Sequence, residues 1–170
     1  MLIDRDGVIV RNRDDYVKSL NEMEVLPGAL EALAELSKHG HRVFVITNQS
    51  AIGRGLTTRA EVDRMHESLS SDLQRLGGRI DAFLVCPHTP EDGCDCRKPA
   101  PGLIYQARDR YGVDLDSAVV IGDAQSDVEA ASTAGCASIL VLSGITSMEN
   151  SDSADHVVAT IQEAARLIIG

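Results

Sequence analysis

Short apolar runs alternate along the chain with longer stretches in which apolar residues recur every three or four positions. Short, nearly continuous apolar runs are typical of strands that are buried on both faces. We therefore predict strands at residues 2–3, 42–47, 82–86, 118–121 and 138–142, and a last edge strand at 156–158.

Helices are predicted in the intervening stretches, and most carry a signal at their ends. Pro27 and Gly40 bracket the first helix, because proline suits the first turn of a helix and glycine its end. A further helix is predicted over residues 102–111. Three helices begin with a predicted pair of capping residues, namely Thr58 with Glu61, Ser126 with Glu129, and Thr160 with Glu163.

This alternation predicts an α/β fold with a Rossmann-like parallel sheet and helices on both of its faces. The 170 residues fit one domain, which we expect to extend over residues 1–170. Ligands of such folds bind beyond the carboxyl ends of the strands. The candidates for a functional site are therefore the polar residues at the strand ends, namely Asp4, Asp6, Thr47, Asn48, Cys86, His88 and Asp123.

The composition and net charge indicate which kinds of molecule the chain can bind. Hydrophobic residues make up 44% of the chain and charged residues 25%, the ordinary balance of a soluble globular protein. No apolar run could span a bilayer and the N-terminus has no signal-peptide pattern, so we expect a cytoplasmic protein that binds no membrane. A monomer is a separate expectation, which these patterns do not determine. The net charge of −10 disfavours nucleic acid. A small phosphorylated substrate stays compatible with it, because a few Arg and Lys residues can reverse the field within one cleft.

Asp4 and Asp6 are separated by one residue, so their carboxylates point the same way on an extended chain. Such a pair can divide the work of phosphoryl transfer. One carboxylate attacks phosphorus, while the other protonates the leaving oxygen and later activates water. Taken alone, the tripeptide is more often a solvated turn.

Three further segments offer groups for the same chemistry. Thr47 and Asn48 end a predicted strand, where a hydroxyl and backbone amides can hold phosphate oxygens. Lys98 can neutralise a transferring phosphoryl group, and Arg97 can bind a second anion with its planar guanidinium. Asp123 can complete a magnesium site, because Mg²⁺ prefers oxygen ligands. Each segment alone also fits a turn, a solvated loop or a helix start.

The cysteines indicate a second metal. Cys86 and His88 are followed, after a gap of five residues, by Cys94 and Cys96. Four such ligands in one loop predict a closed, tetrahedral structural zinc site, with free thiols or a redox pair as the alternatives. The loop directly precedes Arg97 and Lys98, so the zinc is expected to position these cations. We interpret the isolated Cys136 as a small buried hydrophobic residue.

Together and in this order, the motifs resemble the haloacid dehalogenase superfamily of phosphatases. Its signature is D-x-D-G-[TV], a strand-end Thr or Ser, a Lys, and G-D-x-x-x-D, and all four parts occur between residues 4 and 127. The resemblance implies that Asp4 is the nucleophile and Asp6 the general acid and base, and that Thr47 and Lys98 bind the phosphoryl group. The implied magnesium ligands are Asp4, the Asp6 backbone carbonyl and Asp123, supported by Asp127.

Two groups within that superfamily resemble the chain and share its cysteine loop, namely heptose 1,7-bisphosphate phosphatases and histidinol-phosphate phosphatases. Residues 47–56, TNQSAIGRGL, are similar to T-N-Q-S-G-[IL]-[AG]-R-G of the heptose group. This resemblance favours removal of the C7 phosphate of heptose bisphosphate, in lipopolysaccharide biosynthesis. It implies that the rest of the sugar phosphate is bound by Arg97, with Arg54, Asn48 and Ser50. The short gap between His88 and Cys94 is shared with the histidinol-phosphate group, which stays the alternative.

The stretches after Asp6 and after the third strand are too short for a cap domain, so we expect an open active site. A zinc-stabilised binding module without catalysis is an alternative of another class. Against it, a competent residue fills every catalytic position. Only three residues precede Asp4, so we expect a very short first strand, and a few N-terminal residues missing from the numbered chain.

Overall fold

The computed structural model describes residues 1–144 and 153–170. Its centre is a six-stranded sheet in which every described strand pair is parallel. The spatial order is β3-β2-β1-β4-β5-β6. The strands are β1 (Leu2–Ile3), β2 (Phe44–Asn48), β3 (Ala82–Cys86), β4 (Val119–Gly122), β5 (Ala137–Val141) and β6 (His156–Val158). The predicted α/β fold with a parallel sheet is confirmed, and the predicted strands differ from the observed ones by two residues at most.

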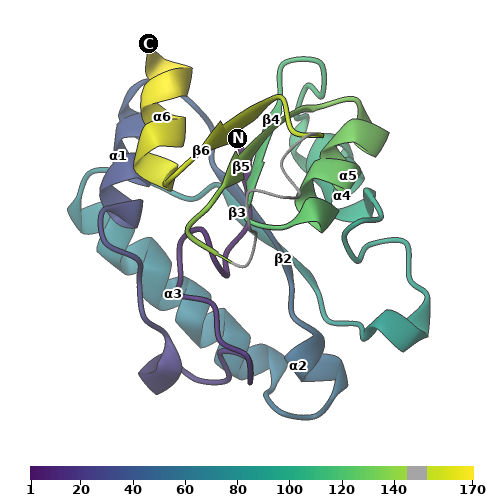
Figure 1. The fold of residues 1–170 in the computed structure, drawn as a ribbon. Coiled ribbons are helices and arrows are strands. Elements are labelled where there is room, and N and C mark those ends of the chain that lie inside the picture. Colours follow the sequence, from purple (N-terminus) through teal and green to yellow (C-terminus); the bar gives the residue numbers. More distant parts are fainter. Residues whose placement is uncertain (145–152) are drawn as a thin grey trace.

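Helices cover both faces of this sheet, as Figure 1 shows. One face packs against α1 (Ala29–Lys38), α3 (Arg59–Arg75) and α6 (Ile161–Ile169). The other packs against α4 (Gly102–Tyr111) and α5 (Gln125–Ala134). The short helix α2 (Ser50–Gly53) follows β2, and 3-10 turns occur at Leu20–Glu22 and Pro90–Asp92. No helix in the described part of the chain combines the length and apolar character needed to cross a membrane.

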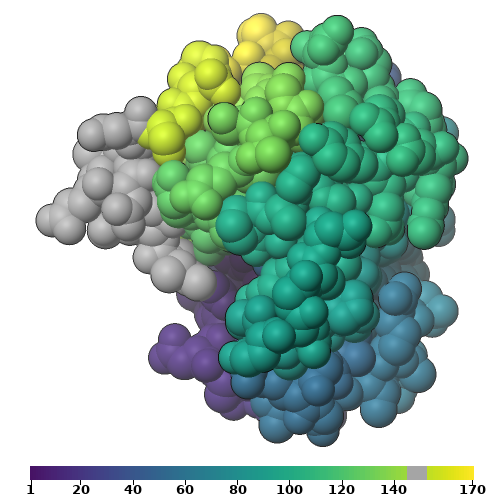
Figure 2. Space-filling model, turned by 90° about the vertical axis from the view of Figure 1, so that its right-hand side faces the viewer, coloured from purple at the N-terminus to yellow at the C-terminus, as the bar shows by residue number. Residues whose placement is uncertain are grey.

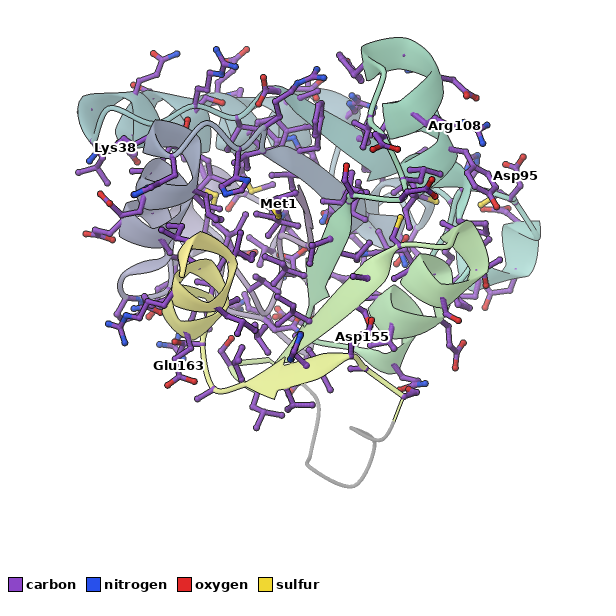
Figure 3. All side chains as sticks on the ribbon, turned by 90° about the horizontal axis from the view of Figure 1, so that it is seen from above. Met1, Lys38, Asp95, Arg108, Asp155 and Glu163 are labelled. Carbon is purple, nitrogen blue, oxygen red and sulfur yellow. The ribbon has the colours of Figure 1, made fainter. Side chains whose placement is uncertain are left out.

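The core has two layers, because successive strand residues point to opposite faces of the sheet. Ile3 and Val45 pack toward α1, α3 and α6, whereas Leu2 and Phe44 pack toward α4 and α5. Seen from above, Lys38 and Glu163 lie on the side of α1 and α6, and Asp95 and Arg108 lie on the other side (Figure 3). Cys136 is 8% exposed beside the second layer, as expected of a small hydrophobic residue.

The order of the strands determines where on the sheet the functional site lies. β1 lies between β2 and β4, so the chain moves outward first on one side of β1 and then on the other. The carboxyl end of β1 is therefore the topological switch point, where such sheets bind ligands. Residues 4–28 leave this end and fold back on themselves through the antiparallel bridge between Val10 and Val25. They contain one 3-10 turn and no separate cap fold.

One of the predicted capping pairs is wrong. The pair Ser126 and Glu129 does not begin a helix, because α5 already starts at Gln125. Its first turn is closed instead by Asp127, whose carboxylate accepts a hydrogen bond from the backbone N–H of Ala124 at 3.1 Å. Thr58 does cap α3, by accepting from the N–H of Glu61 at 3.1 Å. The side chain of Glu61 binds the N–H of Leu20 in place of completing the predicted box.

Candidate active site

Three carboxylates meet at the switch point, from two segments far apart in the sequence. Asp4 follows β1, while Asp123 and Asp127 follow β4, and oxygen atoms of all three lie within 4.8 Å of one another. Glycines make this close approach feasible. A side chain at Gly7, whose φ is +89°, would collide with the Asp123 carboxylate, and one at Gly122 would collide with Asp127.

Lys98 is buried against this acidic group. Its Nζ lies 2.9 Å from Asp4 Oδ1 and 2.6 Å from Asp127 Oδ1, and it donates to the backbone carbonyl of Ile46 at 3.0 Å. Burial lowers the pKa of Lys98, but the carboxylates of Asp127 and Asp4 outweigh it and hold the pKa above its ordinary value. The ammonium group is therefore a fixed positive charge beside Asp4.

Asn48 fixes the backbone that carries this lysine. Its Nδ2 donates to the carbonyl of Lys98 at 3.1 Å, and its Oδ1 accepts from the Lys98 N–H at the same distance. Both ends of the side-chain amide are thus engaged by the protein. Asn48 also lines the cavity described below, so it combines anchoring of Lys98 with a position at the candidate site.

The charge of this cluster suits a divalent cation. If all three carboxylates are ionised, the single ammonium of Lys98 leaves an excess of two negative charges. Burial, opposed by Lys98 and assisted by the carboxylates of Asp127, Asp123 and Asp6, raises the pKa of Asp4 to about 8. A bound Mg²⁺ would balance the charge with the oxygen ligands that it prefers. Both Asp127 oxygens face groups of the protein, namely Lys98 and the Ala124 N–H.

Asp6 lies apart from the other three acids and is held by two residues that the motif analysis overlooked. The buried guanidinium of Arg5 donates to its carboxylate through Nε at 3.2 Å and through NH2 at 2.9 Å. Gln49 Nε2 donates to Asp6 Oδ2 at 2.7 Å. Arg5 is the variable residue of the D-x-D motif, and a residue of unspecified type gives no signal in a motif comparison.

A cavity of about 300 Å³ opens above these groups. Asp4, Asp6, Lys98 and Asp123 line it, together with the predicted substrate-binding residues Asn48, Ser50 and Arg97. The predicted site residues from four separate segments of the chain therefore converge on one cavity.

Two predicted residues lie elsewhere. Thr47 is fully buried beneath the cavity, and its hydroxyl accepts a hydrogen bond from Gln49 Nε2 at 2.8 Å. Arg54 is not among the residues that line the cavity. Its guanidinium lies 3.7 Å from the carboxylate of Glu91, at the surface.

The far wall of the cavity is formed by the segment after β1, including Asn12, Arg13, Asp14, Tyr16 and Val17. Figure 2 shows the purple residues of this segment near the teal residues of the cysteine loop. This part of the chain is polar and irregular, so no hydrophobic period indicated that it contributes to the site. Arg13 adds a second guanidinium to the cavity, although Asp15 pairs with it at 3.0 Å.

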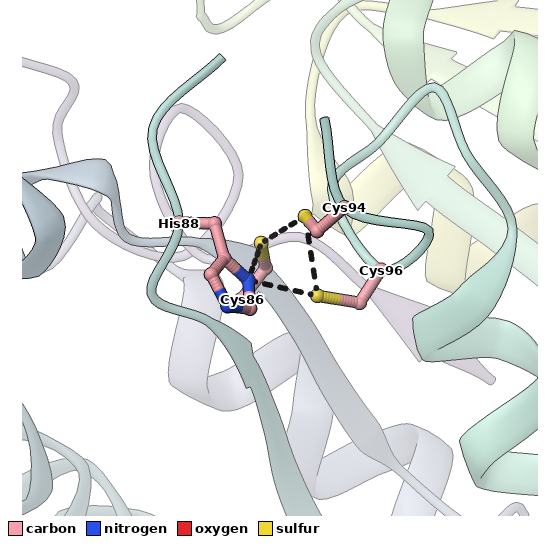
Figure 4. A group of neighbouring side chains, drawn as sticks. All are labelled: Cys86, His88, Cys94 and Cys96. Carbon is pink, nitrogen blue, oxygen red and sulfur yellow. Dashed lines mark hydrogen bonds between the residues drawn. The ribbon is translucent and has the colours of Figure 1, made fainter. Parts of the chain in front are cut away.

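The four predicted zinc ligands converge in the cysteine loop after β3, as Figure 4 shows. The sulfur of Cys86 lies 3.6 Å from His88 Nδ1 and 3.7 Å from the sulfur of Cys94. The sulfur of Cys96 lies 3.3 Å from His88 Nδ1 and 3.5 Å from the sulfur of Cys94. Zn²⁺ bonds of about 2.3 Å to sulfur and 2.0–2.1 Å to nitrogen put tetrahedral donors roughly 3.5–3.8 Å apart. The donor set thus has the size and type of a zinc site.

The electrostatics differ among the three thiols of the loop, because burial raises the pKa of Cys86 and of Cys96. Burial raises the pKa of Cys94, but the neighbouring thiols and the backbone N–H of Arg97 outweigh it and lower the pKa to about 7. A thiol with this pKa readily becomes the thiolate that binds a metal. The loop is also tied to the cavity, since Arg97 NH1 donates to the carbonyl of His88 at 3.4 Å.

Comparison with protein families matches both halves of the chain. Residues 1–77 match the haloacid dehalogenase-like hydrolase family, and residues 95–164 match the HAD-hydrolase-like family. A D-glycero-β-D-manno-heptose-1,7-bisphosphate 7-phosphatase of Pseudomonas aeruginosa is 44% identical over 144 residues, which are 85% of this chain and 81% of that protein. The enzyme of the same name from Bordetella bronchiseptica is 43% identical over 144 residues, or 85% of this chain and 80% of that protein.

Solved structures give the same result. The crystal structure of the D,D-heptose 1,7-bisphosphate phosphatase of B. bronchiseptica, complexed with magnesium and phosphate, matches with a TM-score of 0.94 and 37% identity. The match covers 99% of this chain and 97% of that one. The corresponding enzyme of Burkholderia thailandensis matches with a TM-score of 0.73 and 30% identity, over 99% and 97% of the two chains.

Proposed function

Because this chain belongs to the haloacid dehalogenase-like hydrolases, and among them to the heptose-1,7-bisphosphate 7-phosphatases, we propose that it removes the C7 phosphate of D-glycero-D-manno-heptose 1,7-bisphosphate. The product would be heptose 1-phosphate, an intermediate on the way to the activated heptose of lipopolysaccharide. The observation that supports this function best is the buried Lys98, whose ammonium lies between Asp4 and Asp127 at the floor of the cavity.

In the first step, Asp4 Oδ attacks the phosphorus atom and the bond from phosphorus to the C7 oxygen breaks. Lys98 reduces the negative charge that the nucleophile and the phosphoryl oxygens bring together. Asp6 gives its proton to the departing oxygen, which leaves as the sugar alcohol. The phosphoryl group is then an acyl-phosphate on Asp4.

In the second step, a water molecule attacks the acyl-phosphate and Asp6 accepts the proton of that water. The bond between Asp4 and phosphorus breaks, inorganic phosphate is released, and Asp6 again carries the proton for the next cycle. Asp4 and Asp123 would hold Mg²⁺, which when bound supplies positive charge to the phosphoryl oxygens and orients them toward Asp4.

The second phosphate of the substrate requires a cation other than Lys98. Arg97 lines the same cavity and is the candidate for this contact, because a guanidinium binds phosphate in a bidentate manner. Ser50 and Asn48 lie on the wall where hydroxyl groups of the sugar would pass.

We expect Arg97→Ala to lower kcat/KM for the heptose bisphosphate about ten- to a hundredfold, the usual cost of losing one charge-assisted contact. A small ester such as p-nitrophenyl phosphate has no second phosphate, so its kcat/KM should change less than about threefold. Phosphate release from both substrates is the measurement. Arg75→Ala is the matched control, because Arg75 is exposed on α3 and pairs there with Asp72. Equal losses of kcat/KM on both substrates would show that Arg97 does not bind the second phosphate.

The substrate itself is tested by comparing heptose 1,7-bisphosphate with histidinol phosphate, which has one phosphate and a cationic amine. Asp14 also lines the cavity and could face such an amine, so the comparison is a demanding one. We expect a preference for the bisphosphate of at least about a hundredfold, from the added phosphate contacts. The reverse preference would assign the chain to histidinol phosphate and would leave the aspartyl-phosphate mechanism intact.

We further propose that Cys86, His88, Cys94 and Cys96 hold a structural zinc ion that keeps Arg97 and Lys98 in place. Figure 2 shows the teal residues of this loop at the surface, between the blue region of α2 and the green helices α4 and α5. The loop has few apolar residues with which to hold its shape, so the metal would replace a hydrophobic core there.

Cys94→Ser should therefore lose most of the zinc and lower the thermal stability together with the affinity for phosphate. Metal analysis should find about one zinc per chain in the unmodified protein and well below half of that in the variant. Cys136→Ser is the control, since Cys136 is a buried cysteine outside the cluster. Full zinc content and unchanged activity in Cys94→Ser would show that the ligand set is wrong.

A further inference from the structure

Arg5 is a buried cation that no step of the proposed mechanism uses. Its side chain has no exposed surface, although it lies between the two aspartates of the D-x-D motif. The guanidinium contacts three partners. It donates to the carboxylate of Asp6, it donates to Gln49 Oε1 at 3.0 Å, and its NH1 lies 3.4 Å from His66 Nε2. Burial of an arginine is costly unless its donors are satisfied in this way.

The hydrogen-bond chemistry fixes the orientation of Gln49. Arginine has only donors, so the side-chain oxygen of Gln49 must be the atom that faces Arg5. The amide nitrogen then faces Asp6 Oδ2 at 2.7 Å and Thr47 Oγ1 at 2.8 Å. Because Gln49 is 4% exposed, water has little access to compete for these contacts.

His66 is the third member of the cluster and contacts Arg5. Its ring stacks on Phe83, with the centroids 4.1 Å apart and the planes 8° from parallel. Burial, together with the nearby charge of Arg5, lowers the pKa of His66 to about 3, so the ring is neutral. Since Arg5 can only donate, Nε2 must be the acceptor. Arg5, Gln49 and His66 therefore form one buried cluster, from which Arg5 and Gln49 donate to Asp6 and Gln49 also donates to Thr47.

We propose that Arg5 and Gln49 are positioning residues that hold the side chain of Asp6 in one orientation for its role as the general base. This inference rests on the proposed aspartyl-phosphate mechanism. Both carboxylate oxygens of Asp6 are fixed by these donors, because Oδ1 accepts from Arg5 and Oδ2 accepts from both Arg5 and Gln49 Nε2.

The affected step is the hydrolysis of the acyl-phosphate. The oxygen of water forms a bond to phosphorus, the bond between phosphorus and Asp4 breaks, and the proton of water moves to Asp6. Transfer of the phosphoryl group to Asp4 from p-nitrophenyl phosphate requires no proton, because p-nitrophenolate is a stable leaving group. Loss of the cluster should therefore slow the second step and leave the first step with this ester nearly unchanged.

The test is Gln49→Met, which keeps the length of the side chain and removes its hydrogen-bonding groups. With p-nitrophenyl phosphate we expect kcat to fall about tenfold or more, the effect of losing a hydrogen bond to a charged group. The value of kcat/KM, which reports the first step, should change less than about threefold, so KM should fall with kcat. Rapid mixing should reveal a burst of p-nitrophenolate that approaches one per chain. Gln74→Met, an exposed glutamine of α3, is the matched control.

Gln49→Glu provides a second variant, because a carboxylate can still accept from Arg5 but cannot donate to Asp6. It should show the same separation of kcat from kcat/KM even if Gln49→Met folds poorly. Equal losses of kcat and kcat/KM in this variant, without a burst, would assign the cluster a purely structural role and overturn the inference. Failure of the aspartyl-phosphate mechanism itself gives a different result, because Asp4→Asn would then retain activity.

Discussion

Asp4→Asn is expected to abolish phosphate release while leaving the fold intact. An amide is a poor nucleophile and a weaker magnesium ligand, so both functions of the side chain fail together. We expect kcat to fall at least about a thousandfold on any phosphate ester, which is the order seen when a covalent nucleophile is removed. Phosphate release measures the loss, and circular dichroism with thermal unfolding measures the fold.

The comparison variant is Asp6→Asn. It should be severely impaired with the sugar phosphate, whose leaving oxygen needs a proton, yet should still transfer a phosphoryl group to Asp4 from p-nitrophenyl phosphate. Trapping of the labelled acyl-phosphate in Asp6→Asn, and its absence in Asp4→Asn, would distinguish the two carboxylates. Activity of Asp4→Asn within tenfold of the unmodified chain would contradict the assigned nucleophile.

Lys98→Met should damage stability and catalysis at once. The ammonium contacts two carboxylates and a carbonyl in a site where its side chain is 2% exposed. Its removal leaves Asp4 and Asp127 buried without their cation, and breaking a buried ion pair costs about 3–5 kcal/mol. Urea unfolding monitored by circular dichroism should show a lower midpoint, and phosphate release should fall at least about a hundredfold because the transferring group loses its charge partner.

The control is Lys38→Met, because Lys38 is half exposed at the end of α1 and pairs there with Glu35 at 3.1 Å. Such a surface pair contributes about 0–1 kcal/mol, so stability and activity should be nearly unchanged. A Lys98→Met variant as stable and as active as this control would mean that the buried charge plays no part in either property.

The amino-acid sequence by itself determined the layer architecture and the position of the site. Short apolar runs separated by amphipathic stretches admit few solutions other than a covered parallel sheet, and parallel strands bring their carboxyl ends to one edge. Asp4, Asp123 and Lys98 could therefore be assigned to one site from their positions after strands or loops. The spacing of Cys86, His88, Cys94 and Cys96 was equally informative, since all four lie within one short loop.

Only the tertiary structure decided which side chains touch. The helix start at Gln125 was missed because Asp127 closes the turn from inside the helix, where its carboxylate also reaches Lys98. Arg54 belongs to a segment that resembles the substrate-binding motif, but the turn after α2 directs it toward Glu91.

Arg5 shows why the contacts between polar side chains could not be predicted from the sequence. A charged residue in a polar motif is expected at the surface, because burial of a charge is costly and arginine is seldom fully buried. It is buried here because Asp6, Gln49 and His66, which come from three different segments, supply acceptors for its donors. Hydrophobic periodicity records which face of an element is covered, whereas the pairing of polar atoms depends on distances across the fold. The sequence thus located the two aspartates, and the packing of distant segments supplied the groups that orient them.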